Sequence, residues 1–67
     1  MKYIVIEIQT NQDGTVGNIV WDYDSRYEAE SKYHSILASA ALSSLPCHTA
    51  VLVQSDGMLL TADHYDH

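Results

Sequence analysis

The sequence predicts an α+β fold in which two antiparallel hairpins pack on one helix, a two-layer β-β-α-β-β architecture. Three observations lead to it. Four short segments alternate apolar and polar residues, an Asp-Gly pair lies inside each pair of segments, and one helical stretch separates the pairs. At 67 residues the chain forms a single small domain, residues 1–67, with little core and marginal expected stability.

The first hairpin is predicted over residues 3–23, with its turn at Asp13-Gly14 because glycine reaches positive φ at no steric cost. In its first strand, residues 3–10, we expect the three alternating isoleucines to face the core: Ile4, Ile6 and Ile8. For its second strand, residues 16–23, two phases are open, and we favour the one that turns the aromatic side chains inward: Ile19, Trp21 and Tyr23.

The helix is predicted to begin after Ser25, which forms a capping box with Glu28, and to reach about Ser44, since Pro46 disfavours helical geometry before it. One stripe at helical spacing is expected to cover the sheet: Ala29, Tyr33, Ile36, Leu37 and Ala40.

The opposite face of the helix is also apolar, and no charged residue follows Lys32 in the helix. Small side chains there allow a second helix to approach closely, so we predict a homo-oligomer, most simply a dimer. The predicted interface residues on this face are Tyr27, Ala38, Ala41, Leu42 and Leu45.

The second hairpin is predicted from strands at His48–Gln54 and Met58 to about Ala62, joined at Asp56-Gly57. Leu60 and either Met58 or Leu59 are expected to point inward, and residues 63–67 either extend the strand or fray. The uncovered face of the sheet is a further candidate interface, with an apolar set expected to comprise Tyr3, Val5, Val16, Val20 and part of Val51 and Val53.

Three basic residues against nine acidic ones give a net charge of −6, which argues against direct nucleic-acid binding. An acidic inhibitor that mimics nucleic acid and binds a basic groove on a host or defence protein is therefore an alternative. Its weakness is that four of the acids lie around the expected helix start, where they complement the helix dipole: Asp22, Asp24, Glu28 and Glu30.

The single cysteine, Cys47, leaves no intrachain disulfide and favours a reducing compartment, so we expect a cytoplasmic protein. The apolar run at the start is too short for a signal-peptide core or a membrane span. No phosphate-binding glycine motif is present, and Cys47 and His48 would lie on opposite faces of a strand, so we expect neither enzymatic activity nor a cofactor.

The C-terminal segment Asp63-His64-Tyr65-Asp66-His67 raises a metal-binding protein as another alternative. On a helix His64 and His67 could share a metal, but on a strand they face opposite ways. We therefore assign no metal ligands.

Three segments resemble short uncharacterised proteins of bacterial phages and mobile elements: residues 3–10, residues 28–38 and the run from Pro46 through Asp56-Gly57. The resemblance implies a phage or host context, and with it the possibility of a host protein as partner, but no catalytic residues. The function we predict is a small non-enzymatic protein-interaction module that self-associates through its helix or its sheet.

Overall fold

Two hairpins flank a single helix in the computed structural model, which describes residues 1–67. The elements are β1 (Tyr3–Thr10), β2 (Val16–Tyr23), α1 (Arg26–Ala41), β3 (Cys47–Gln54) and β4 (Leu59–Asp66). Their order confirms the predicted α+β, β-β-α-β-β fold.

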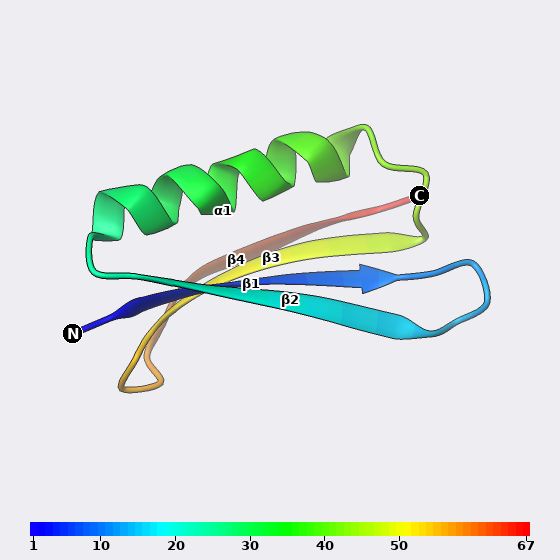
Figure 1. Ribbon diagram of the computed structural model, residues 1–67. Helices are drawn as coiled ribbons and strands as arrows, with labels where there is room; N and C mark the ends of the chain where they lie inside the picture. The colour runs from blue at the N-terminus through cyan, green and yellow to red at the C-terminus, as the bar shows by residue number, and fades with distance from the viewer.

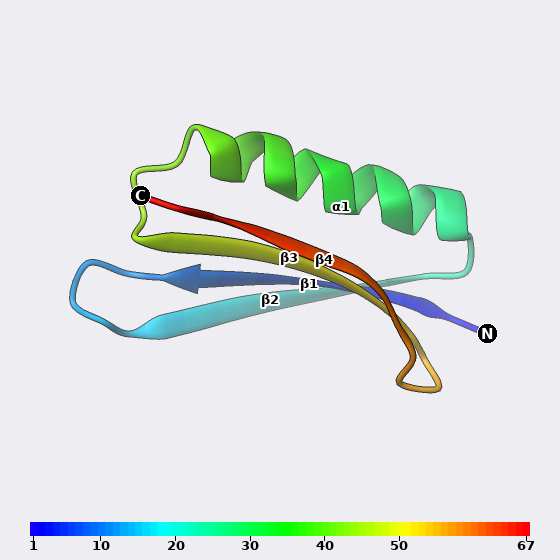
Figure 2. The same cartoon turned by 180° about the vertical axis from the view of Figure 1, so that it is seen from behind.

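All four strands belong to one antiparallel sheet in the order β2-β1-β3-β4. The strands that begin the two hairpins, β1 and β3, therefore lie side by side in the centre, and the second strands form the edges. Figure 1 and the reverse view in Figure 2 show the helix along one side of this sheet and no element on the other side. The protein thus has a covered face and an open face.

The two hairpin turns have the same construction. In the first, Gly14 has φ +86° and donates its N–H to the Asn11 carbonyl, while Asn11 N–H bonds to Thr15 O. In the second, Gly57 has φ +91°, and the same two bonds join Gly57 to Gln54 and Gln54 to Met58. This pattern, a tight turn followed by a glycine at positive φ, confirms both turn predictions and explains why each needs glycine.

The core lies between α1 and the covered face. Leu52 is 1% exposed and Val5 is fully buried, and the helix closes over them with the stripe expected from its sequence. Ala29, Tyr33, Ile36 and Ala40 of that stripe are buried and Leu37 is half-buried. Three alanines without any exposed surface lie in this layer and allow the backbone of the helix to approach the sheet: Ala29, Ala40 and Ala50.

The predicted phase of β1 is wrong, whereas the phase favoured for β2 is right, since Ile19, Trp21 and Tyr23 oppose Glu7, Val5 and Tyr3 of the covered face. Trp21 and Tyr23 pack against the core, while Ile19 is largely exposed. The register pairs Val5 with Trp21 and with Leu52, so these three side chains share one face.

The length of the first turn decides which residues of β1 and β2 share a face of the sheet. Because the first turn pairs Thr10 with Val16, odd-numbered residues of β1 oppose odd-numbered residues of β2. The isoleucines therefore cannot point to the same side as Trp21, and burying the aromatic residues turns the isoleucines away from the helix. Tyr3 and Val5 consequently line the covered face, not the open face as predicted.

The helix is shorter than predicted and ends at Ala41 rather than Ser44. Ser25 occupies the N-cap position with extended backbone angles, but its side chain makes no capping hydrogen bond, so the predicted capping box is not formed. Of the two alternatives for residues 63–67, the structure adopts the first, because β4 continues past Ala62 to Asp66.

An irregularity in the pairing of β3 with β4 lies between Leu52 and Val53. On β4 it places one extra residue, Leu60, between Leu59 and Thr61, and Leu60 packs against the core as predicted. Met58 and Leu59 are both more than half exposed, so neither of them is the second inward residue that the sequence suggested.

Candidate interaction surface

The open face of the sheet carries an apolar patch at its centre. Its members alternate along the strands with the residues buried under the helix, and they come from all four strands. We call them the open-face patch: Ile4, Ile6, Ile8, Val20, Val51, Val53, Leu59 and Ala62.

Strand pairing assembles this patch in rows. Ile6 opposes Val20 on one side and Val51 on the other, and Val51 in turn opposes Ala62. One row across the full width of the sheet is therefore entirely apolar. In the next row Ile4 opposes Val53, which opposes Leu59. Cross-strand neighbours of this kind lie within contact distance of one another and form a continuous surface.

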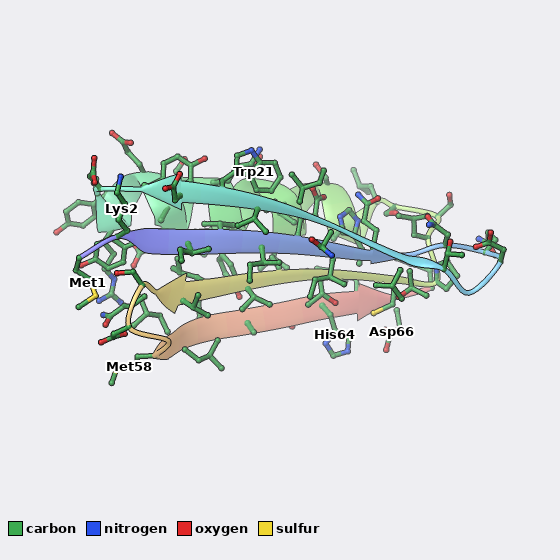
Figure 3. All side chains as sticks on the ribbon, turned by 60° about the horizontal axis from the view of Figure 1, so that its bottom comes forward. Met1, Lys2, Trp21, Met58, His64 and Asp66 are labelled. Carbon is green, nitrogen blue, oxygen red and sulfur yellow. The ribbon has the colours of Figure 1, made fainter.

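Polar residues border the patch at one end of the open face. His64 and Asp66 project from the outer strand β4 at that end (Figure 3), and His64 Nε2 lies 3.4 Å from Asp66 Oδ2. On the adjacent strand Cys47 Sγ lies 3.6 Å from Thr49 Oγ1. These side chains are held in pairs along their own strands, and no group of three His, Cys, Asp or Glu residues is arranged to hold a metal ion.

The two histidines of the C-terminal segment do not come together. His64 lies on the open face, whereas His67 Nε2 donates to the carbonyl of Ala40 at the end of the helix, 3.0 Å away. The strand alternative considered for this segment is therefore the one that the structure adopts, and the helical spacing that would let both imidazoles share a metal is absent.

The residues predicted as a helix interface lie mostly on the outer side of the helix. Tyr27 and Leu42 are 83% and 91% exposed, at opposite ends of α1, and Ala38 and Ala41 are exposed between them. Leu45 is half-buried and lies beyond the helix end. The two large side chains are thus separated by about 22 Å of helix carrying small or polar residues.

A buried polar pair on the covered face was not found from the sequence. His48 of β3 is buried and Glu7 of β1 is largely buried, with 2.6 Å between Glu7 Oε2 and His48 Nε2. Gln9 donates to the same carboxylate oxygen at 3.2 Å. Nδ1 of His48 is buried with no hydrogen-bond partner. The only sequence signal was the position of Glu7 in the same alternating phase as Val5.

Most of the acidic residues bind a neighbouring group and lie away from the open face. Asp24 and Glu30 form ion pairs with Lys2 and Arg26 at 3.0 and 2.9 Å. Asp13 and Asp56 accept backbone hydrogen bonds inside the two turns. Of the nine acids only Asp22 and Asp66 stand on the open face, where they pair across strands with Ile4 and Cys47.

These features define a class of protein, a small two-layer α+β domain with one helix-covered face and one uncovered apolar face. No pocket indents its surface, and no helix has the length and apolar character needed to cross a membrane. A scan of family models and searches of curated proteins and solved structures gave no match to the chain.

Proposed function

We propose that this chain is a small non-enzymatic protein-interaction module that self-associates through its sheet or its helix. The observation that carries the proposal is the open-face patch, a continuous apolar surface that the helix leaves uncovered. Monomeric proteins rarely leave contiguous apolar surface of this kind in water, and such surfaces commonly bind other proteins.

The small size of the core supports the same proposal. Only eight of the 67 residues are buried, and six of these form the cluster under the helix. Because so short a chain buries a small share of its surface, a partner that covers further apolar side chains stabilises the folded state by mass action.

A cytoplasmic location is part of the proposal. Cys47, the only cysteine, is a half-buried free thiol beside the open-face patch, and a reducing compartment keeps it from forming disulfides with other chains.

Static light scattering across a concentration series tests self-association. We expect the mass to rise from 7.5 kDa toward twice that value with increasing concentration. A constant 7.5 kDa up to about 1 mM, where even weak association is detected, would contradict it.

A pull-down from host lysate at low and high salt tests binding to other proteins. Partners that persist at high salt support an apolar interface. Basic partners that are released by salt would instead favour the acidic inhibitor considered from the sequence, because screening weakens charge-driven binding.

A further inference from the structure

We propose that the open-face patch binds the same patch of a second copy, so that two sheets stack face to face with Ile6 and Val51 near the centre. The inference rests on the proposed function and adds to it the surface and the partner. It follows from the composition of the face, its area and the placement of its charges.

The composition of the face suits a second copy. An apolar centre with polar residues at its border is the usual arrangement in protein interfaces. A twofold dimer uses the same surface on both subunits, so each half must be apolar where the other half is apolar. The row formed by Val20, Ile6, Val51 and Ala62 meets this condition, since it is apolar from one edge of the sheet to the other.

The area is sufficient for a dimer. The face is four strands wide and each strand has eight residues. With strands about 4.8 Å apart and about 26 Å long, it measures roughly 500 Å² before side-chain relief is counted. Complete overlap of two such faces therefore buries about 1,000 Å² in total, the level at which specific interfaces begin.

The charges of the molecule also permit this contact in spite of the net charge of −6. The two carboxylates of the open face, Asp22 and Asp66, lie on opposite edge strands and at opposite ends of the sheet. In aligned sheet packing the twofold axis runs along or across the strands, so neither carboxylate lies over its own copy. The other seven acids lie on the covered face, in turns or around the helix.

The outer side of the helix is the less suitable surface for a second copy. Its large apolar side chains, Tyr27 and Leu42, stand at opposite ends, and exposed Ser31 and His34 lie between them. A helix pair along this line has a narrow apolar contact, whereas the open-face patch extends over four strands. The geometry therefore points to the sheet.

Val20→Lys is the variant that tests the inference. Val20 is 56% exposed on an edge strand, so a lysine there is tolerated by the monomer but places a charge in the proposed interface. Leu42→Lys is the matched control, because it adds the same charge at a more exposed position on the helix side. Ala62→Lys, on the other edge strand, is a second test should Val20→Lys fail to fold by circular dichroism.

Sedimentation equilibrium of the full chain gives the readout. We expect wild type and Leu42→Lys to dimerise with similar Kd. Val20→Lys and Ala62→Lys should raise the Kd at least about 30-fold, because each lysine brings a charge into the apolar contact.

Two results would overturn the inference in different ways. If dimers persist in both Val20→Lys and Ala62→Lys, the open face is not the contact, but the proposed function still holds. The dimer then forms through the helix, if Leu42→Lys abolishes it, or through paired edge strands. A wild-type chain that stays monomeric rejects both the inference and the proposed self-association.

Discussion

Glu7 and His48 are 41 residues apart in the chain and meet under the helix, with 2.6 Å between Glu7 Oε2 and His48 Nε2. Their side chains are 13% and 5% exposed. The carboxylate oxygen accepts and Nε2 of His48 donates, while Nδ1 of His48 has no partner. The pair links the two central strands β1 and β3 at the covered face.

Removing this carboxylate is expected to destabilise the fold. Glu7→Ala removes the acceptor that lies 2.6 Å from His48 Nε2 and leaves this nitrogen only Gln9 Nε2, 3.5 Å away. The free energy of unfolding therefore falls by about 1–3 kcal/mol. Urea denaturation at low protein concentration measures the loss. The control is Asp22→Ala, at an exposed position of β2, where we expect a change within about 0.5 kcal/mol. Equal losses in the two variants would show that the buried pair contributes nothing.

The core prediction compares two leucines. Leu52 is almost fully buried, so Leu52→Ala creates a cavity and lowers the free energy of unfolding by about 2–5 kcal/mol, enough to unfold much of so small a domain. Leu42→Ala changes it by less than about 0.5 kcal/mol, because the side chain is in water. Thermal unfolding followed by circular dichroism measures both. A large loss in Leu42→Ala at low concentration would contradict the position of the helix end.

The turn prediction compares two glycines. Gly57 has positive φ, so Gly57→Ala strains the second turn and costs about 1–2 kcal/mol. Gly17 lies in β2 with negative or extended φ and open space around its α-carbon, so Gly17→Ala is neutral or slightly stabilising. Denaturant midpoints of the two variants give the comparison, and a neutral Gly57→Ala would mean that the turn does not need its left-handed residue.

The first turn supplies a pH prediction. The Thr15 hydroxyl, which donates to Asp13 at 2.6 Å, and then the Thr15 backbone N–H lower the pKa of Asp13 below its ordinary value of 3.8. A lowered carboxyl pKa stabilises the fold above pH 3.8, and that contribution disappears as the pH falls through the lower folded-state value.

Thr15→Val removes the hydroxyl but keeps the backbone N–H, so the pKa of Asp13 should rise toward 3.8 without reaching it. Carboxyl-carbon NMR titration measures the pKa in both proteins. An unchanged pKa would show that the hydroxyl bond is not made in solution.

The sequence alone was sufficient to predict the helix and the strands and to identify the residues on the helix side of the core. Four strands, two glycine turns and the helical stripe from Ala29 to Ala40 were all predicted, because alternation, helical spacing and positive φ at glycine are local properties of the chain. Local signals failed at the helix start, where Ser25 has the right residue type and position but makes no side-chain capping bond.

Two results required the tertiary structure. The first is the direction of the isoleucines, since the alternation within β1 alone predicts the opposite face. Pairing with β2 decides between them, because the turn sets which residues of the two strands share a face and a single helix can cover only one face. The second is the meeting of Glu7 and His48, which depends on the register of β1 with β3 across 41 residues of chain.

The sequence by itself thus determined that this protein has two hairpins around a helix and more apolar residues than its core can bury. Only the tertiary structure decided where the apolar residues outside the core lie, which is on the open face around Ile6 and Val51. The physical reason is that alternation along a strand divides its apolar side chains between the two faces of the sheet. Which face the helix covers depends on the pairing between strands and on which face buries more apolar area.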